Sequence, residues 1–448
     1  MTSLTLAQKS DLEPQSEANE LALPKAPVSP EDTGISREFL LELTLRIAQT
    51  TKQFTTEWLA ERICLPSRVV LNLVDELRTE RTLAVLGQSG NFGLQLGITE
   101  RGRAVALESM KTTSYVGPAP VTLKAYSDLM EAQLARLPKV TPERVSEAIS
   151  ELVLPEETVQ IAGLASFSSR SLFLHGPPGN GKTSLGQMLH AAVDGDLWIP
   201  HCIGIGNSII RVFDPECHRP TTWETRAREV DRRWMRIRRP FIIAGGELTI
   251  ESLDLAYHEG LGYYEGPLHL KANGGTFLID DFGHQRVDHS ELLNRWIHPL
   301  ESRVDYLTLK TGQKFPVPFR PMLIISTNLD PDKVMDPAFL RRMGYRIFMN
   351  NPTPTQYREI FERYAQREGI TVPEGLLDTL LQHYQADDRP HRSCEARDLI
   401  ERAKDICRYR SESVRLTDDI MDLAWRGYFG RRERWAENST GEPSESPY

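Results

Sequence analysis

The chain has 448 residues, of which 40% are hydrophobic and 26% are charged, and its formal net charge is −9. This length suits about two or three domains, and the negative charge argues against a protein that coats nucleic acid with its whole surface. No run of about 18 apolar residues occurs, so we expect no membrane span. The first residues lack the layout of a secretion signal, which predicts a cytoplasmic protein. The cysteines are scattered, which predicts reduced thiols rather than a disulfide framework.

The two ends of the chain differ in composition from the rest. Residues 1–36 are rich in Ser, Pro and acidic residues, and residues 431–448 have a similar composition. Such segments cannot bury enough apolar surface to fold, so we expect both to be disordered.

The next segment, residues 37–112, predicts a winged-helix domain. Three stretches with helical apolar spacing come first, and the third, residues 65–80, carries its apolar side chains on one face. An alternating pattern around Ser-Gly-Asn at residues 83–99 then predicts a β-hairpin, and Thr99 opens a last helix. Three helices, a hairpin and a final helix are the layout of a winged helix.

The rest of the chain divides into three further segments. Residues 113–170 predict a linker, Pro- and Gly-rich up to residue 122, followed by a helical lead-in. Strand and helix patterns alternate over residues 171–351, which predicts a parallel α/β core. Residues 352–430 have helical patterns throughout.

The strongest motif is Gly-Pro-Pro-Gly-Asn-Gly-Lys-Thr at residues 176–183, which fits G-x-x-x-x-G-K-[ST]. An apolar run predicts a strand before it, and a helix is predicted after it. The glycines permit a backbone path that turns amide N–H groups towards an oxyanion, and the helix N-terminus adds its positive end. We expect Lys182 to reach the β- and γ-phosphates of ATP, and the Thr183 hydroxyl to help hold Mg²⁺. The predicted nucleotide-binding residues of this loop are Gly176, Pro177, Pro178, Gly179, Asn180, Gly181, Lys182, Thr183 and Ser184.

A second apolar strand, predicted at residues 276–279, ends in Asp280 and Asp281. Ligands in open α/β sheets gather at the carboxyl ends of strands, so both carboxylates are expected beside the phosphate loop. Asp280 would hold Mg²⁺, partly through water, and Asp281 stands where a general base must polarise the attacking water. The alternative is a pair of surface aspartates that cap a turn, which the apolar strand before them disfavours.

Two later features extend this pattern. The apolar strand predicted at residues 320–328 ends in Asn328, whose amide could orient the attacking water; the alternative is an Asn in a turn. Arg341 and Arg342 end a short helix 13 residues further on. They are either a solvated helix end or guanidinium groups that stabilise transition-state charge in a neighbouring subunit's site. The second role requires an oligomer.

The order of these elements resembles that of the AAA+ ATPases. Residues 176–183 look like Walker A, residues 277–281 like Walker B and Asn328 like sensor 1. Arg342 or Arg341 looks like the arginine finger. In the helical region, Arg397 looks like sensor 2, the arginine that contacts the γ-phosphate within the same chain.

This resemblance covers about residues 140–430. It implies a P-loop AAA+ core, a parallel αβα sandwich, with a C-terminal all-helical lid. Residues 269–319 look like the branch of the magnesium chelatases and enhancer-binding activators. Residues 246–275 look like a group of bacterial AAA+ proteins with N-terminal winged helices. Asp281 departs from the glutamate usual in Walker B, and its carboxylate is one methylene shorter.

Three features bear on the partner. Residues 260–267 contain Tyr263 and Tyr264, which could grip a substrate in a ring pore or pack on the protein core. Residues 223–240 hold seven arginines against three acidic residues, and could contact nucleic acid or form ion pairs with a neighbouring subunit. The third helix of the winged-helix segment has a net charge of −1, which is poor for phosphate contact and favours protein recognition.

We therefore expect an ATPase that uses ATP and Mg²⁺, assembles with its own copies as a hexameric ring and remodels a protein client. One alternative is a nucleotide-dependent regulator or loader that binds DNA through the winged helix. A second alternative, suggested by Asp281, is a nucleotide sensor without hydrolysis.

Overall fold

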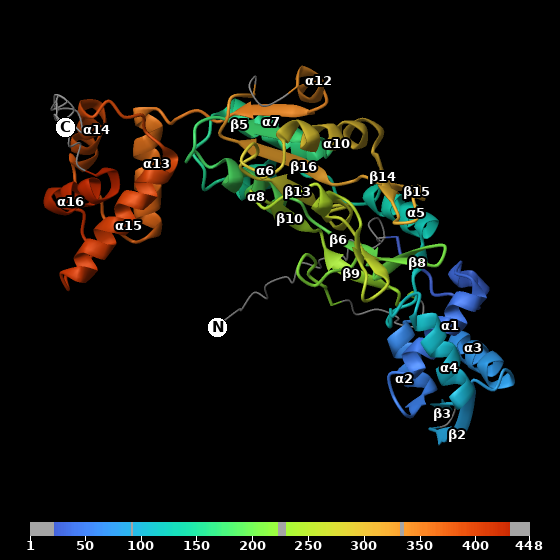
Figure 1. Ribbon diagram of the computed structural model, residues 1–448. Helices are drawn as coiled ribbons and strands as arrows, with labels where there is room; N and C mark the ends of the chain where they lie inside the picture. Colours follow the sequence, from blue (N-terminus) through green and yellow to red (C-terminus); the bar gives the residue numbers. More distant parts are fainter. Residues whose placement is uncertain (1–21, 91–92, 223–229, 332–335, 431–448) are drawn as a thin grey trace, which may run out of the picture.

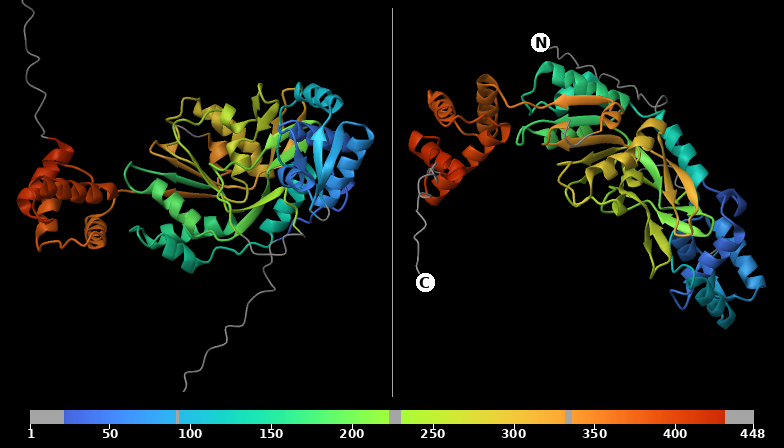
Figure 2. Two further views of the ribbon diagram at one scale, coloured as in Figure 1. Left: turned by 90° about the horizontal axis from the view of Figure 1, so that it is seen from below. Right: turned by 45° about the horizontal axis from the view of Figure 1, so that its top comes forward.

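The computed structural model describes residues 22–90, 93–222, 230–331 and 336–430 (Figure 1). The chain forms an N-terminal body, a central α/β core and a C-terminal helical body, which follow one another across the view. Both views in Figure 2 show the helical body joined to the core by an extended segment. Within the described ranges, no helix is both long and apolar enough to cross a membrane.

The N-terminal body packs its helices around a three-stranded antiparallel sheet of order β1-β3-β2. Thr55 and Thr99 each cap a helix by accepting a hydrogen bond from a backbone N–H three residues on. Helices and a hairpin follow one another here in the order expected from the sequence, and the assignment as a winged helix stays a prediction. The elements are η1 (Glu31–Thr33), α1 (Arg37–Ala48), β1 (Phe54–Thr55), α2 (Thr56–Ile63), α3 (Ser67–Thr79), β2 (Leu83–Ser89), β3 (Gly93–Ile98) and α4 (Glu100–Met110).

Residues 22–36 have a defined structure, so the prediction of disorder fails for this part of the N-terminal segment. The Pro24 carbonyl accepts a hydrogen bond of 2.9 Å from the backbone N–H of Asp231. The Thr33 carbonyl accepts one of 3.1 Å from Nη1 of Arg233. A proline-rich segment lacks donors but keeps its carbonyl acceptors, and buried groups of the core use them here.

The predicted linker at residues 111–122 is packed rather than open. Tyr115 and Ala119 are buried, and the Ala119 N–H donates to the Ile63 carbonyl at 2.8 Å. The segment ends in β4 (Val121–Thr122), which pairs in parallel with β7 (Cys202–Ile205). Its apolar side chains therefore join the N-terminal body to the core.

The core is a parallel sheet of five strands in the order β10-β13-β16-β5-β17. Helices cover both faces. Phe277 and Ile279 of β13 pack with Trp296 on one face, whereas Leu278 packs with Leu185 on the other, as the alternation of side chains along a strand requires. The core elements are α6 (Pro142–Ala148), α7 (Glu156–Ser168), β5 (Leu172–His175), α8 (Lys182–Ala191), β10 (Phe241–Ala244), β13 (Thr276–Ile279), α10 (His289–Ser302), β16 (Met322–Thr327), α12 (Pro337–Leu340) and β17 (Tyr345–Phe348).

The helical body follows β17 and has its own apolar core. Its helices are α13 (Pro354–Arg367), α14 (Leu376–Ala386), α15 (Ser393–Tyr409) and α16 (Asp418–Phe429). The predicted parallel α/β core with helices on both faces, followed by an all-helical C-terminal region, is confirmed.

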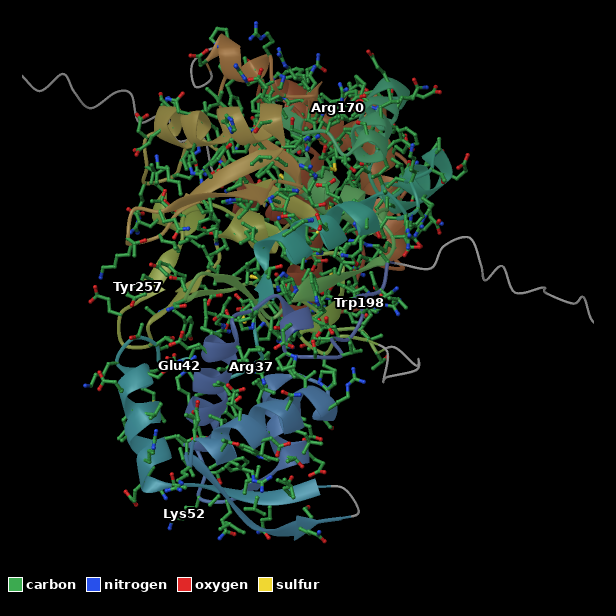
Figure 3. The ribbon with its side chains drawn as sticks, turned by 90° about the vertical axis from the view of Figure 1, so that its right-hand side faces the viewer. Arg37, Glu42, Lys52, Arg170, Trp198 and Tyr257 are labelled. Atoms are coloured by element: carbon green, nitrogen blue, oxygen red, sulfur yellow. The ribbon has the colours of Figure 1, made fainter. Side chains whose placement is uncertain are left out.

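Smaller sheets and hairpins lie between the core and the N-terminal body. Figure 3 shows Trp198 and Tyr257 in this region, between Lys52 at one end of the view and Arg170 at the other. The sequence did not predict these smaller sheets, in which antiparallel and parallel pairs are mixed. Its elements are α5 (Leu123–Leu134), β6 (Asp196–Pro200), β8 (Ser208–Arg211), β9 (Trp234–Arg238), η2 (Glu251–Leu253), β11 (Ala256–His258), β12 (Tyr263–Glu265), α9 (Leu268–Lys271), β14 (Val304–Thr308) and β15 (Lys314–Pro318).

The two tyrosines of residues 260–267 are part of this region. Tyr264 is 5% exposed, and its hydroxyl accepts a hydrogen bond of 3.0 Å from the Lys310 N–H. The Tyr263 ring packs edge-on against Tyr115 at 5.7 Å. The structure therefore supports the alternative in which both rings pack on the protein.

The described part of the arginine-rich segment is used inside the chain. Arg233 and Asp231 form a buried ion pair of 2.8 Å, and Arg236 lies 3.0 Å from Asp196. Residues 223–229 of this segment lie outside the described ranges. Neither nucleic acid nor a neighbouring subunit is needed to balance Arg233 and Arg236, whereas Arg232 and Arg238 of the same segment are exposed.

Candidate active site

The loop between β5 and α8 has the backbone path that its glycines predict. Gly176, Gly179 and Gly181 have φ values of +134°, +83° and +84°. At Gly176 a Cβ atom would lie 2.4 Å from the Met349 carbonyl oxygen, so no side chain fits there. The helix α8 begins at Lys182, so its first N–H groups point into the loop.

Lys182 is the cation of this loop. It is 6% exposed, and its Nζ donates hydrogen bonds of 2.8 Å to the carbonyl oxygens of both Gly176 and Pro177. Burial lowers the pKa of Lys182, and the carboxylates of Asp280 and Asp281 act in the opposite direction. The ammonium group is thus held at the mouth of the loop, facing the two aspartates.

Asp280 gathers hydroxyl groups from two neighbouring elements. Thr183 Oγ1 donates to its Oδ1 and Oδ2 at 2.8 and 2.9 Å, and Ser326 Oγ at the end of β16 donates to its Oδ1. One carboxylate and two hydroxyl oxygens are hard ligands of the kind that Mg²⁺ takes in phosphate sites, where water and phosphate oxygens complete the shell. The donor set therefore fits the predicted magnesium ion.

Asp281 contacts Asn328, which follows the end of β16. Asn328 Nδ2 donates to its Oδ1 at 2.8 Å, and His284 Nδ1 lies 3.2 Å from that oxygen. Asp281 has a left-handed backbone with φ +50°, which Asp tolerates better than most residues. Its side chain is 48% exposed, so water can reach the carboxylate.

These groups line a cleft of about 550 Å³ between the sheet edge and the helical body. Arg397 of α15 lines it from the helical side, and Asp398 accepts hydrogen bonds from its guanidinium group and raises its pKa. The structure thus brings the phosphate loop, both aspartates, Asn328 and Arg397 into one cleft. The helical body also contributes the lining residues Tyr364, Arg367, Ser393 and Cys394, and the segment between α6 and α7 contributes Glu151 and Leu152.

The helical body touches the phosphate loop directly. The backbone N–H of Cys394 donates to the Gly179 carbonyl at 2.9 Å, and that of Ser393 donates to Asn180 Oδ1 at 3.2 Å. Asn180 also donates to Asn351 Oδ1 at 2.8 Å. Any shift of α15 would therefore change the hydrogen bonds that it makes with the phosphate loop.

Arg341 and Arg342 lie elsewhere. They follow α12, at the top of Figure 1, and in the described part of the chain neither lines the cleft. Arg341 is exposed, and Arg342 lies 3.1 Å from Glu301. The structure does not bring these arginines to the site of their own chain. Their role in the site of a neighbouring subunit therefore stays a prediction.

Ser326 was not predicted from the sequence, and neither were Tyr364, Arg367, Ser393 and Cys394 of the helical body. Ser326 had a visible signal, because it stands two residues before Asn328 at the end of an apolar strand. Tyr364 and Arg367 had none, since only the folding of α13 against the core brings them to the cleft.

Comparisons with known proteins give little beyond the fold. Residues 353–427 match the family model of a domain of unknown function (DUF8689), and no curated protein sequence matches the chain. Similar solved structures include the Thermotoga maritima RuvB Holliday junction branch migration motor, with 13% identity, 61% of this chain and 70% of that chain covered, and a TM-score of 0.36. NtrX from Brucella abortus in complex with ADP has 13% identity, 72% and 65% coverage and a TM-score of 0.38. Its complex with ATP has 13% identity, 78% and 73% coverage and a TM-score of 0.38. With similarities this low, function rests on the side chains of the cleft.

Proposed function

We propose that this chain binds ATP with Mg²⁺ in the cleft between the phosphate loop and the helical body, and hydrolyses it to ADP and phosphate. The observation that carries the proposal is the contact of Thr183 and Ser326 with Asp280, beside the buried ammonium group of Lys182. A phosphate loop alone would bind many anions. A loop that faces an oxygen cluster suited to a divalent cation favours a nucleoside triphosphate with its metal.

Each side chain has a task in this proposal. The inward N–H groups of the loop and Lys182 bind phosphate oxygens, and Thr183 and Asp280 hold Mg²⁺. The bound metal ion would neutralise charge on the phosphate oxygens. Asp281 accepts the proton of the attacking water, and Asn328 fixes the orientation of that carboxylate.

Arg397 supplies a cation from the helical body of the same chain. Because α15 also contacts Gly179 and Asn180, loss of the γ-phosphate would change the contacts that hold the helical body on the core. This gives hydrolysis a route to movement. Arg342, with Arg341 as the alternative, would complete the site of the next subunit in a ring of copies of this chain, with six subunits as the expected number.

The nucleotide proposal is tested with Lys182→Ala and a fluorescent ATP analogue in the presence of Mg²⁺. Saturable binding by the parent chain, and none by the variant, is the expected result. Lys124→Ala is the matched control, because Lys124 is an exposed lysine outside the cleft that pairs with Asp128. Equal binding by the Lys182→Ala variant would refute the site.

We further propose that the motor remodels a protein partner recognised by the N-terminal body. The cations of α3 are already engaged: Arg68 donates to the Val28 carbonyl, and Arg78 pairs with Asp75 at 2.9 Å. A helix whose arginines are engaged in this way offers little for phosphate contact, which favours a protein partner over DNA.

A gel-shift series with duplex DNA at increasing salt separates the two partners. If the partner is a protein, we expect no shift of the DNA even at low ionic strength. A shift that disappears when residues 1–112 are deleted would establish the DNA-binding alternative instead.

A further inference from the structure

A second cavity, of about 260 Å³, lies at the opposite edge of the core sheet from the nucleotide cleft. It is lined by Thr276 and Met322, which begin β13 and β16, whereas the cleft is lined by residues at or just after the other ends of these strands. Even a strand of four residues, as in β13, spans roughly 13 Å. The two sites are therefore separate.

The lining of this cavity is strongly cationic. Four of its side chains carry positive charge, and among the described residues none of the lining side chains is a carboxylate. In a chain with a net charge of −9, such a gathering from four segments is not a consequence of composition. The four cations are Lys139, Arg239, Arg303 and Arg320.

The arginines are only partly neutralised by groups behind the lining. Arg320 pairs with Glu131 at 2.6 Å, and Arg239 donates to the Gly274 carbonyl at 2.6 Å, with Asp194 acting on it electrostatically. Burial lowers the pKa of Arg239 to about 10. The charge at this edge of the sheet is therefore incompletely balanced.

The positive charge of Arg303 is the least neutralised of the three arginine charges. It donates to the Ser169 carbonyl at 3.3 Å, and it forms no ion pair with a carboxylate in the part of the chain that the structure describes. Burial lowers the pKa of Arg303, and the charges of Arg320 and Arg170 lower it further. Figure 3 shows Arg170 at the upper end of the core in that view.

Ser166 adds an independent observation. It lines the cavity, it is 3% exposed, and its Oγ finds no hydrogen-bond partner among the described residues. A buried hydroxyl without a hydrogen-bond partner destabilises the folded state. This destabilisation would be relieved by a ligand that accepts a hydrogen bond from Ser166 while it neutralises the arginines.

We propose that this cavity binds a small organic phosphate. The phosphoryl group lies among Arg239, Arg303 and Arg320, and one of its oxygens accepts a hydrogen bond from the Ser166 hydroxyl. A phosphoryl group brings up to two negative charges and three acceptor oxygens to the guanidinium donors, whereas a single carboxylate brings one charge and two oxygens. The rest of the ligand packs on the apolar wall, which consists of Leu134, Leu137, Val140, Phe167 and Met322.

The test is calorimetric titration of the full chain carrying Lys182→Ala, which silences the phosphate loop. The probes are phenyl phosphate, inorganic phosphate and phenol. Phenyl phosphate should bind saturably, inorganic phosphate more weakly and phenol not at all. Arg303→Gln should weaken phenyl phosphate binding about tenfold, as expected for one charge-assisted hydrogen bond.

Two further variants serve as a second test of the site and as its control. Ser166→Ala removes an unsatisfied hydroxyl, so it should keep the thermal stability of the parent chain and still weaken phenyl phosphate binding. Arg136→Gln is the matched control, because Arg136 lies on the same loop as Lys139 but outside the lining, and should leave binding unchanged.

Several outcomes would overturn the proposal. Absence of phenyl phosphate binding in the Lys182→Ala background would mean that the cavity is not an anion site. Equal binding of phenol would make the cavity an apolar pocket, and equal binding of inorganic phosphate would remove the role of the apolar wall. If Arg303→Gln changes the oligomeric state but not phosphate binding, the arginines serve a neighbouring copy of the chain.

Discussion

Asn328 and Asp281 are hydrogen-bonded across the ends of two adjacent strands, with Nδ2 of the amide 2.8 Å from Oδ1 of the carboxylate. The two residues were predicted separately, one as a water-orienting amide and one as a general base. In the structure they form one unit, because β16 lies beside β13. The amide donor leaves Oδ2 of Asp281 as the oxygen that is free of this contact.

The first prediction concerns this carboxylate. Asp281→Asn should slow ATP hydrolysis by roughly 10²–10⁴-fold, because it removes the proton acceptor, and should leave nucleotide binding near the parent level. Phosphate release and equilibrium binding measure the two effects. Asp128→Asn, an exposed aspartate far from the cleft, is the control. Unchanged turnover in the Asp281→Asn variant would exclude Asp281 as the base.

The second prediction concerns Ser326, which sequence analysis did not assign. Because Ser326 donates to Asp280 and adds an oxygen to the magnesium donor set, Ser326→Ala should raise the Mg²⁺ concentration needed for half-maximal hydrolysis by about tenfold. Nucleotide binding without Mg²⁺ should not change. Ser302→Ala, at the exposed end of α10, should have no effect. A loss of binding without Mg²⁺ would point to a distorted loop instead.

The third prediction concerns the two arginines outside the cleft. Arg342→Ala should leave ATP binding intact and reduce turnover, because the guanidinium would act in the next subunit. Arg341→Ala measured in parallel decides which of the two arginines acts. Mixing the inactive Arg342→Ala and Lys182→Ala chains should restore part of the activity, since some interfaces then combine an intact loop with an intact arginine. Turnover that is first order in protein and unaffected by mixing would contradict a shared site.

The fourth prediction concerns the buried pair Arg233 and Asp231, which holds the N-terminal segment on the core. Arg233→Met should destabilise the fold by about 3–5 kcal/mol, because the Asp231 carboxylate is left buried without its partner. Thermal unfolding and limited proteolysis of residues 22–36 measure the loss. Adding Asp231→Asn should recover part of the stability, and a double variant no better than the single one would contradict the explanation.

The fifth prediction concerns pH. Burial, with the nearby charge of Arg239, lowers the pKa of His190 to about 4 from 6.5. Between these values the unfolded chain binds more protons than the folded one, so stability should fall as the pH drops from 6.5 towards 4, by about 1–3 kcal/mol. His190→Gln can keep a contact with Thr276 and should flatten this dependence. The exposed His258→Gln should not, and melting curves across this pH range provide the measurement.

Much of the core could be predicted from local patterns. The glycine spacing at residues 176–181 prescribes a loop around an anion, and the apolar strand before Asp280 and Asp281 places them at a strand end. Helical periodicity predicted the C-terminal body. These features are short-range, since each depends on the conformations and side-chain faces of consecutive residues.

Other features depend on contacts between distant segments. Residues 22–36 look disordered by composition, but Arg233 and Asp231, some 200 positions later, order them through backbone hydrogen bonds. By sequence, Tyr263 and Tyr264 could either grip a substrate or pack on the core, and only the contacts with Tyr115 and Lys310 decide between these alternatives.

The sequence by itself determined that a phosphate loop, an acidic strand end and a helical region follow one another in this chain. Only the tertiary structure decided that Ser326 joins Thr183 on Asp280, that Asn328 bonds Asp281, and that Ser166 and four cations share a cavity at the far edge of the sheet. Periodicity records which face of an element is buried. It does not record which element lies opposite, because strand order and helix docking are set by packing between residues that lie far apart in the sequence.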